Sequence, residues 1–497
     1  MRIPGWAFSN SYAALPARFF ARLAPIPVAE PRLIKLNAAL AAELGLECGS
    51  LDDAALAALF SGNTVPEGAD PIATAYAGHQ FGQFVPQLGD GRAILLGEVL
   101  DRCGIRRDIQ FKGSGRTPWS RNGDGRAALG PVLREYLVSE AMHALGIPTT
   151  RSLAAVTTGE VVFRERALPG AIVTRIAASH VRVGTFEYFA ARRDAEAVRI
   201  LADYVIGRHY PELVSAERPY LELLRAVCRR QAALIASWMH VGFIHGVMNT
   251  DNTAVSGETI DFGPCAFMDA YDPASVFSSI DGMGRYAYAN QPPAAQWNLA
   301  RFAETLIALI DPEAERAVEM ASAEIDAFAA HFGAHWLDGM RRKFGLLTQL
   351  QGDLELIRAW LDTLARNGCD YTLTFRRLCD AADPSLDAGR AEATLRSCFS
   401  QSDDCAAWMA DWRARLAREP QVGAQRAASM RRVNPAFIPR NHRIEQVIAA
   451  AIERNEFGPF EELLEVLSHP YQARPELESY AAPPQPAERV TRTFCGT

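Results

Sequence analysis

The sequence predicts an α+β protein in which a small β-rich region precedes a larger helical region. Short apolar runs separated by glycine turns lie between about residues 71 and 180, and they predict strands at 93–100, 107–112, 160–163 and 170–175. One helix interrupts these strands; it is expected to begin at Pro131, a favourable first helical residue, and to run through Met142. From about residue 185 the pattern becomes helical, with helices predicted at 195–206, 220–240 and 296–310, and several more between 312 and 420.

The two ends of the chain are less regular. Residues 1–70 mix aromatic residues and prolines with short helical segments, which we expect at 31–44 and 52–60. The C-terminal part is rich in proline and contains one predicted helix, near His442–Arg454. These patterns divide the chain into an N-terminal extension (1–70), a β-rich lobe (71–184), a helical lobe (185–425) and a C-terminal extension (426–497).

Composition excludes several classes of protein. The chain has 497 residues, enough for two or more substantial domains or lobes, with 49% apolar and 22% charged residues and a net charge of −7. Such a charge gives no global field that attracts nucleic acid or an anionic membrane, and no apolar stretch reaches the roughly 18 residues of a membrane span. Nine scattered cysteines without zinc-type spacing favour a reduced, cytoplasmic location.

The most informative segment is residues 245–252, His-Gly-Val-Met-Asn-Thr-Asp-Asn, followed by Asp-Phe-Gly at 261–263. A protein kinase has His-Arg-Asp-x-x-x-x-Asn and then Asp-Phe-Gly in these places. The position of the kinase catalytic aspartate is occupied here by Val247, which cannot accept a proton. The motif therefore keeps the metal-binding residues of a phosphoryl-transfer site without the usual base, and it predicts a kinase-like fold with a different chemistry.

Asn252 and Asp261 are the predicted metal ligands. Mg²⁺ prefers oxygen ligands and usually binds one or two side chains together with substrate phosphates. Asn252 offers an amide oxygen and Asp261 a carboxylate, and the residues between them, 253–260, are predicted to form a β-hairpin with its turn at 256–258. Such a hairpin would bring both ligands to the same end.

Lys112 is the first candidate for binding phosphate. It ends the predicted strand at 107–112 and is followed at once by the flexible turn Gly113-Ser-Gly115. Glu135 lies in the next predicted helix and could pair with Lys112, as the lysine of kinase strand 3 pairs with a helix glutamate. Glu140 is an alternative partner that spacing alone does not exclude.

Two glycine turns and two arginines complete the predicted phosphate site. No Gly-x-Gly-x-x-Gly loop precedes Lys112; the chain has instead Gln-Leu-Gly-Asp-Gly-Arg at 87–92 and Arg-Asn-Gly-Asp-Gly-Arg at 121–126. Gly-Asp-Gly is also an ordinary hairpin turn, but here two such turns flank Lys112 and each ends in arginine. Arg175 and Arg182, between the last predicted strand and the first helix of the helical lobe, add planar donors that match phosphate geometry.

These segments and several others resemble the SelO family, also called YdiU in bacteria, whose kinase-fold members were once labelled pseudokinases. The resemblance covers nearly the full length and rests on long strings: Phe8-Ser-Asn-Ser-Tyr12 with Leu15-Pro16, Tyr76-Ala-Gly-His-Gln-Phe-Gly82, Gln110-Phe-Lys-Gly-Ser-Gly-Arg-Thr-Pro118, the 245–252 segment, Asp261-Phe-Gly-Pro-Cys-Ala-Phe-Met-Asp269, Asn434-Pro435 and Thr493-Phe-Cys-Gly-Thr497. It implies a protein-kinase-like bilobal fold and an enzyme, a protein adenylyltransferase, that transfers AMP from ATP to Ser, Thr or Tyr hydroxyls of proteins. Some members of the family transfer UMP from UTP.

Carried over residue by residue, the resemblance assigns Asp251 as the proton acceptor and Asn252 and Asp261 as ligands of Mg²⁺ or Mn²⁺. It also implies that the nucleotide binds end for end relative to kinases, with the γ-phosphate inward and the α-phosphate at the reaction point. The residues that would contact ATP are Gly89, Gly91, Arg92, Lys112, Asp124, Gly125, Arg175, Arg182 and Asp261.

The tail departs from some members of the family. Members that carry selenocysteine have it near the C-terminus, where this chain has Cys495. One hypothesis is a regulatory disulfide between Cys495 and Cys265, which follows Asp261-Phe-Gly-Pro directly. The alternative is an unpaired tail thiol in a reducing cytoplasm.

Two other functions stay open for this sequence. One is a kinase that transfers the γ-phosphate to a protein or, like the aminoglycoside kinases, to a small molecule; those small-molecule kinases share the His-Gly and Asp-Phe-Gly strings but keep an aspartate where Val247 stands. The other is a non-catalytic ATP-binding pseudokinase, against which the retention of Asp251 and of both predicted metal ligands argues.

Overall fold

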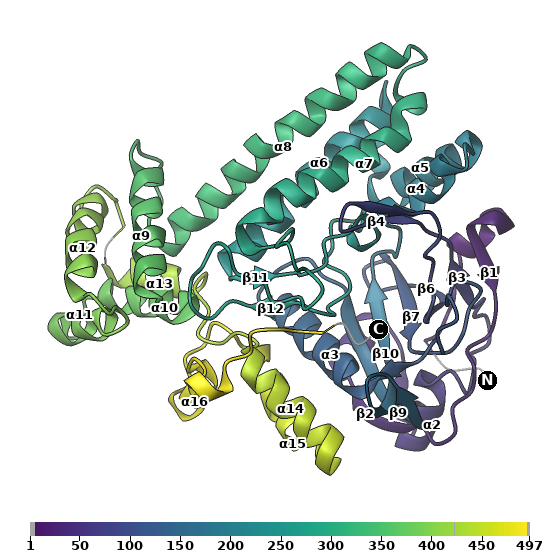
Figure 1. Cartoon of the computed structure of the whole chain (residues 1–497), viewed down its shortest axis with the longest axis horizontal. Coiled ribbons are helices and arrows are strands. Elements are labelled where there is room, and N and C mark those ends of the chain that lie inside the picture. The colour runs from purple at the N-terminus through teal and green to yellow at the C-terminus, as the bar shows by residue number, and fades with distance from the viewer. Residues whose placement is uncertain (1–4, 422, 495–497) are drawn as a thin grey trace.

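The computed structural model describes residues 5–421 and 423–494, and it shows an α+β protein in which about half of the residues are helical. Figure 1 shows a β-sheet beside a group of long helices, with a further cluster of helices on the far side of that group from the sheet. The chain enters the sheet first and the helical region second, as the sequence predicts.

The main sheet is antiparallel and mixes strands from the first 180 residues in the order β1-β3-β6-β7-β10-β9-β2, with β8 paired to β10. Its strands are β1 (Phe20–Arg22), β2 (Arg32–Leu36), β3 (Ile72–Thr74), β6 (Ala93–Leu100), β7 (Arg106–Lys112), β8 (Ala127–Ala128), β9 (Arg151–Phe163) and β10 (Ala167–Ala177). Two small two-stranded sheets join β4 (Gly78–Gln80) to β5 (Gln83–Val85), and β11 (Phe243–Ile244) to β12 (Ala266–Phe267).

The four predicted strands are confirmed, but three of them are longer than predicted, one by a single residue and two by several residues. The strand at 93–100 is β6, and the strand at 107–112 is β7, which begins one residue earlier. The predicted strands at 160–163 and 170–175 are parts of β9 and β10, a long hairpin whose register shifts twice. Residues 152–156 of β9 are all buried, so they lack the alternation by which a half-buried strand is recognised.

The predicted helix at 31–44 is wrong over its first half. Residues 32–36 form β2, which pairs with β9, because an extended segment here completes one edge of the sheet. The Asn37 side chain then accepts a hydrogen bond from the Leu40 N–H and starts the short helix α1 (Ala38–Glu43). The predicted helix at 52–60 is confirmed as α2 (Asp53–Phe60), with Asp52 as its N-cap.

Helix α3 (Leu129–Ala144) lies between the sheet and the C-terminal helices. It begins two residues before Pro131, which therefore stands in the first turn, where a missing N–H breaks no helical hydrogen bond. Arg134 of α3 forms an ion pair with Glu445, and the rings of Tyr136 and Phe460 lie 5.5 Å apart. The C-terminal region thus covers the outer face of α3.

The helical region is built on α6, α7 and α8, which pack side by side (Figure 1). Helix α7 begins at Gln291, five residues before the predicted start, because Pro292 and Pro293 fit its first turn. The helices of this region are α4 (Val183–Ala191), α5 (Ala195–His209), α6 (Pro219–His240), α7 (Gln291–Ile310), α8 (Ala314–Lys343), α9 (Asp353–Asn367), α10 (Tyr371–Ala381), α11 (Ala388–Arg396), α12 (Ser402–Leu416) and α13 (Gly423–Arg431).

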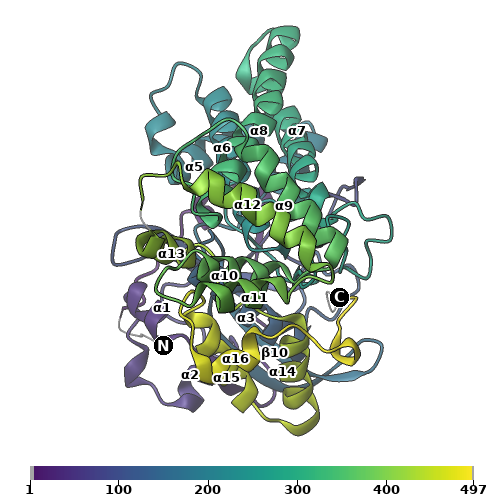
Figure 2. The ribbon, with the colours of Figure 1, turned by 90° about the vertical axis from the view of Figure 1, so that its left-hand side faces the viewer.

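The C-terminal part contains more helix than predicted. Helix α14 (Asn441–Arg454) is the predicted helix at 442–454, and α15 (Gly458–Ser468) and the short α16 (Glu478–Ala481) follow it. Helix α15 buries Phe460, Leu463, Val466 and Leu467 along one face. Figure 2 shows α14, α15 and α16 grouped together, and α14 and α15 pack against α3. In the part of the chain that the structure describes, no helix combines the length and apolarity needed to cross a membrane.

The packing of α6 against α8 fixes the end of α6, from which the chain continues into the 245–252 segment. His240 is the last residue of α6, and its ring lies against Gly339 of α8, where an added Cβ would be 2.0 Å from His240 Cε1. The Nε2 atom of His240 lies 2.9 Å from the Trp336 carbonyl oxygen, to which it can donate a hydrogen bond. Burial lowers the pKa of His240 to about 4, so the ring is neutral at pH 7.

Substituting Gly339 with alanine should therefore destabilise the protein, since the ring of His240 must move to admit a methyl group. We expect a loss of about 1–3 kcal/mol of unfolding free energy from overpacking, partly offset by the ~1 kcal/mol by which alanine favours a helix. Gly333→Ala, in the same helix with no atom within 4 Å of the added Cβ, is the matched control and should be neutral or stabilising. Urea unfolding of both variants tests this; equal stabilities would contradict the close contact.

Candidate active site

The 245–252 segment is anchored at its start by His245. The His245 ring stacks on Trp238 of α6 at 5.4 Å, and its Nε2 lies 2.9 Å from the Ile260 carbonyl oxygen. Burial lowers the pKa of His245, which keeps the ring neutral so that Nε2–H can donate to that carbonyl. The histidine of the motif therefore joins the 245–252 segment to the residue that precedes Asp261.

The predicted β-hairpin at 253–260 does not form. Ala254 pairs with Arg182 and Thr259 pairs with Thr149, each through an isolated β-bridge, and a turn closed by the Gly257 N–H donating to the Ala254 carbonyl lies between them. The two halves of the segment thus pair with different neighbours instead of with each other, because the backbones of Arg182 and Thr149 each offer one half a partner. Asn252 and Asp261 are nevertheless brought to the same cavity.

Asp261 lies at the centre of a buried charge cluster. Its Oδ1 accepts hydrogen bonds from Lys112 Nζ at 2.7 Å and from Arg175 Nη2 at 3.0 Å. Its φ of +68° is in the left-handed region, which aspartate tolerates better than most residues. Burial opposes ionisation, but Lys112 and Arg175 outweigh it and hold the pKa of Asp261 well below its usual value. Asp261 is therefore a carboxylate at neutral pH.

Glu135 is the second acid of this cluster, and the predicted Lys112–Glu135 pair is confirmed. Lys112 Nζ donates to Glu135 Oε2 at 2.7 Å, and Arg175 Nε donates to Glu135 Oε1. The rival partner Glu140 instead forms a 2.7 Å ion pair with Arg151. Two cations from strands β7 and β10 thus share two carboxylates, one from α3 and one from the Asp-Phe-Gly segment.

Asp251 lies beside this cluster and is nearly buried. Burial raises the pKa of Asp251 to about 7, against the opposing effects of Arg182 and a hydrogen bond from Gln80. Arg182 donates to the Asp251 carbonyl oxygen at 2.9 Å, while its guanidinium packs 4.5 Å from the centre of the Tyr76 ring. Asn252 Nδ2 donates to the Val247 carbonyl at 2.9 Å, which leaves the Asn252 amide oxygen for another partner.

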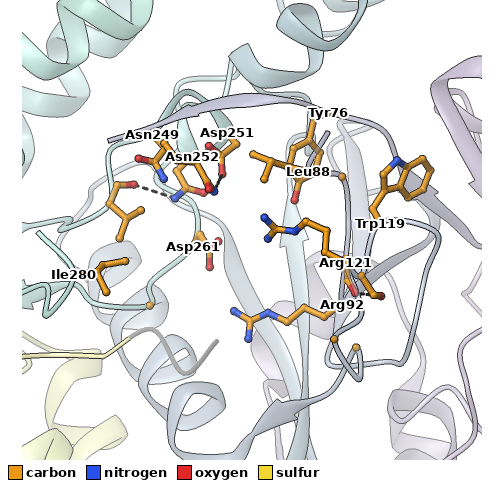
Figure 3. A pocket seen from close by; sticks show the side chains of 18 of the residues that line it. Tyr76, Leu88, Arg92, Trp119, Arg121, Asn249, Asp251, Asn252, Asp261 and Ile280 are labelled. Carbon is orange, nitrogen blue, oxygen red and sulfur yellow. Dashed lines mark hydrogen bonds between the residues drawn. The ribbon is translucent and has the colours of Figure 1, made fainter. Parts of the chain in front are cut away.

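A cavity of about 480 Å³ opens in front of Asp251 (Figure 3). Asp251, Asn252 and Asp261 lie on one side of it, and Arg92 and Arg121 extend towards them from the opposite side. Of the predicted catalytic, ATP-contacting and metal-binding residues, those that line the cavity are Gly89, Gly91, Arg92, Asp124, Gly125, Asp251, Asn252 and Asp261. Lys112, Arg175 and Arg182 are buried behind this lining and are connected to it through Asp261 and Asp251.

The two Gly-Asp-Gly turns form the wall that carries the arginines. Gly89 packs against the Trp119 ring, where an added Cβ would lie 2.2 Å from Trp119 Cγ, and Gly125 packs on Gly115 at 2.1 Å by the same measure. Side chains at these positions would push the turns apart. Asp124 accepts hydrogen bonds from Arg164 Nη1 at 2.8 Å and Nη2 at 3.1 Å, so its carboxylate holds another lining residue in place.

The β4–β5 hairpin lies directly over the 245–252 segment, a contact that the sequence analysis missed. An added Cβ at Gly78 would lie 2.5 Å from Asp251 Oδ1. Three hydrogen bonds join the two segments: His79 N–H to Thr250 Oγ1 at 2.6 Å, Phe81 N–H to Asn249 Oδ1 at 3.0 Å, and Gln80 Nε2 to Asp251 Oδ2 at 3.4 Å. The hairpin and the start of α4, where an added Cβ at Gly184 would lie 3.2 Å from Asp251 Cα, together bury Asp251.

Glu187 of α4 fastens this hairpin. Its Oε1 lies 2.5 Å from His79 Nδ1, and its Oε2 accepts a hydrogen bond from Thr250 Oγ1, also at 2.5 Å. One carboxylate therefore binds both the hairpin and the 245–252 segment. The sequence held a signal for this contact, because Tyr76-Ala-Gly-His-Gln-Phe-Gly82 was part of the family resemblance, but the string was given no chemical role.

Three further arginines line the cavity that were not predicted as site residues: Arg121, Arg126 and Arg164. Arg121 and Arg126 border the second Gly-Asp-Gly turn, whose repeated arginine was visible in the sequence. Arg164 lies in the β9–β10 connection, 40 residues from the Asp124 that it contacts, and no local sequence pattern indicates that it belongs to the site.

The donor set fits a divalent cation. Asp261 supplies a carboxylate that is ionised at neutral pH. Asn252 supplies an amide oxygen, since its hydrogen bond to Val247 uses the amide nitrogen. Asp251 Oδ1 is buried without a hydrogen-bond partner among the residues that the structure describes. Oxygen ligands of this kind suit Mg²⁺ or Mn²⁺.

Cys265 is buried, its Sγ lies 3.6 Å from the Phe262 carbonyl, and burial raises the pKa of its thiol to about 12. Its predicted partner Cys495 lies outside the described residues, so the disulfide hypothesis stays a prediction. The eight cysteines of the described chain carry free thiols.

Cationic turns, a carboxylate and an amide oxygen around one cavity are typical of enzymes that use nucleotide polyphosphates. Comparison with known proteins is consistent with this class. Residues 5–468 match the family described as "Protein adenylyltransferase SelO". The chain belongs to the SelO family and is an enzyme of the protein nucleotidyltransferase class.

Curated relatives named "Protein nucleotidyltransferase YdiU" match at full length. The protein of Rhizobium meliloti (strain 1021) is 65% identical over 491 residues, covering 99% of this chain and 99% of its own. Those of Rhizobium johnstonii and of Bradyrhizobium sp. (strain BTAi1 / ATCC BAA-1182) are each 64% identical, and each alignment covers 99% of this chain. The resemblance found in the sequence is confirmed.

Replacing Gly78 with alanine should displace the Asp251 carboxylate, because the added methyl group overlaps Asp251 Oδ1. We expect the rate of nucleotidyl transfer to fall about 10- to 100-fold, the effect of misplacing a reacting group by about 1 Å. Gln83→Ala, at an exposed position of the same hairpin, is the control and should keep the wild-type rate. Single-turnover transfer assays test this, and full activity of Gly78→Ala would contradict a role for the hairpin in placing Asp251.

Proposed function

We propose that the enzyme transfers AMP from ATP to Ser, Thr or Tyr hydroxyls of proteins and releases pyrophosphate. The observation that carries this proposal is that Asp251, not the residue at 247, presents a carboxylate beside Asn252 and Asp261 at the edge of a cavity lined by arginine. The described arrangement of sheet and helices agrees with a kinase-like bilobal fold. We assign residues 71–184 and 185–425 to its two lobes and residues 1–70 and 426–497 to extensions.

In this proposal Asp251 is the general base. It lies at the edge of the cavity, its side chain keeps an oxygen without a hydrogen-bond partner within the described chain, and the hairpin holds it in a dry position. A substrate hydroxyl that enters the cavity would give its proton to this carboxylate as it attacks phosphorus. Val247 also lines the cavity, but its side chain cannot accept a proton.

Asn252 and Asp261 would hold Mg²⁺ or Mn²⁺, which, when bound, neutralises phosphate charge and polarises the phosphoryl oxygens. The carboxylate of Asp261 is already oriented by Lys112 and Arg175, so it is positioned before any metal arrives. The residues that we propose to contact ATP, directly or through this cluster, are Gly89, Gly91, Arg92, Lys112, Asp124, Gly125, Arg175, Arg182 and Asp261.

The end of the nucleotide that faces Asp251 decides the reaction. The γ-phosphate is the most highly charged end, and the deepest cations, Lys112 and Arg175, lie behind Asp261. We propose that the γ-phosphate points towards them, which leaves the α-phosphate next to Asp251. The leaving group would then be pyrophosphate. A kinase requires the reverse orientation and a glycine loop over the phosphates, and this chain has neither that loop nor an aspartate at 247.

The roles of the two aspartates can be separated. Asp251→Asn should keep ATP affinity but lose about 10²–10⁴-fold in rate, the usual contribution of a general base. Asp261→Asn, chosen because asparagine tolerates the positive φ at this position, should lose metal-dependent ATP binding itself. Calorimetric titration with ATP and metal, together with transfer assays, tests both. Wild-type turnover by the Asp261 variant would remove the metal site from the mechanism.

The transferred group distinguishes adenylyl transfer from phosphorylation. We expect label on the α-phosphorus of ATP to enter protein and pyrophosphate to be released, since the attack is on the phosphorus nearest Asp251. Incorporation of γ-label with ADP as product would establish a kinase instead. The same assay with α-labelled UTP decides whether UMP is also transferred, and intact-mass analysis of the product gives the added group independently.

A further inference from the structure

The cations that line the cavity differ in what already binds them. Arg126 forms a 3.0 Å ion pair with Glu160, and Arg164 forms a 2.8 Å ion pair with Asp124. Arg92 acts electrostatically on Asp261, where it favours the ionised carboxylate. The positive charge of these three arginines is thus partly compensated by acidic side chains of the protein itself.

Arg121 is different. Within residues 5–421 and 423–494 its side chain makes no hydrogen bond, ion pair or ring contact, although it lies on the cavity wall and is exposed to the cavity. Figure 3 shows its side chain extending from the wall towards Asp251, Asn252 and Asp261, above Arg92. An unpaired guanidinium directed at a group of carboxylate and amide oxygens is positioned to bind an anion that lies between them.

The backbone at this position is held in an unfavourable conformation. Arg121 has a φ of +48° and Asn122 a φ of +70°, two successive non-glycine residues in the left-handed region. The flanking turn maintains them: the Thr117 N–H donates to Ser120 Oγ at 2.8 Å, Ser120 Oγ donates to the Gly91 carbonyl, and the Gly123 N–H donates to the Ser120 carbonyl at 2.7 Å. Strain of this kind persists at functional sites, where it presents a side chain that a relaxed turn would not.

We propose that Arg121 is a binding residue for the pyrophosphate portion of the nucleotide, on the wall opposite the proposed base. This inference rests on the proposed function, since it takes the cavity to be the nucleotide site. The planar guanidinium can donate two parallel hydrogen bonds to phosphate oxygens. Because the side chain is not committed to another acid, it becomes neutralised only when the phosphate chain enters, and it stabilises the leaving group where charge accumulates.

A binding experiment with three variants tests this assignment. Arg121→Gly removes the guanidinium and relieves the positive φ, and Arg121→Lys keeps the charge without the planar donors. Asn122→Gly relieves the neighbouring strain but changes a side chain that does not line the cavity, so it is the matched control. Affinities for ATP, inorganic pyrophosphate and AMP are measured by calorimetry with Mg²⁺ present, and thermal unfolding is measured for each variant.

We expect Arg121→Gly to bind ATP and pyrophosphate about 10- to 100-fold more weakly, the loss of a charge-assisted contact, with AMP affinity unchanged. Arg121→Lys should fall between it and the wild type, and Asn122→Gly should bind all three ligands normally. Both glycine variants should unfold at or above the wild-type temperature, because each gains a residue that favours positive φ.

Three results would overturn the proposal. The first is wild-type affinity of Arg121→Gly for pyrophosphate. The second is a loss of AMP affinity in Arg121→Gly equal to its loss of ATP affinity, which would mean that Arg121 stacks on the base or supports the fold. The third is a loss of pyrophosphate affinity in Asn122→Gly equal to that in Arg121→Gly. The outcome is separate from that of the labelling assay. If the wild type incorporated γ-label, the proposed function would fail while the pyrophosphate contact of Arg121 could still be measured.

Discussion

The structure depends on one buried cluster of four charges, Lys112 and Arg175 with Glu135 and Asp261. Its members come from two neighbouring strands, from the helix packed on the sheet, and from the Asp-Phe-Gly segment that follows residues 245–252. The cluster is neutral as a whole, and each acid bridges both cations. Removing one carboxylate would leave a buried cation uncompensated, at a cost of about 3–5 kcal/mol. The sheet and the helical region are therefore held in register by the same atoms that orient Asp261.

This arrangement also explains why the cavity wall carries so many arginines. Lys112 and Arg175 are already neutralised by their two acids, so they offer a triphosphate less net charge than their number suggests. Additional positive charge must come from residues that line the cavity itself. The two Gly-Asp-Gly turns supply it, because glycine at 89 and 125 lets each turn pack tightly while the adjoining arginines extend inward. In the proposed function, side chains of this wall take the place of the backbone donors of a kinase-type glycine loop.

Local patterns were sufficient to predict most strands and helices, Glu135 as one of two candidate partners of Lys112, and the approach of Asn252 and Asp261 to the same site. They failed where long-range contacts decide the structure. The segment at 253–260 has a good hairpin pattern, yet its limbs pair with Arg182 and Thr149. Residues 32–36 read as helix but become an edge strand, because β9 needs a partner. Contacts such as Asp124 with Arg164, or Glu187 with His79, join residues that are 40 and 108 positions apart, and no spacing rule reaches that far.

This chain has its carboxylate at position 251 instead of the kinase position 247, and this makes the place of the carboxylate depend on the β4–β5 hairpin. A base at 247 would lie near the start of the segment, where Val247 lines the cavity and its backbone is bound by His245 and Asn252. Asp251 instead lies where the segment turns under the β4–β5 hairpin, so its placement depends on Gly78 being small enough to admit it. Glu187 then has to hold the hairpin and the segment together. The hairpin, which a kinase-type motif search would pass over as a loop, is thus as necessary to the position of Asp251 as the motif that contains it.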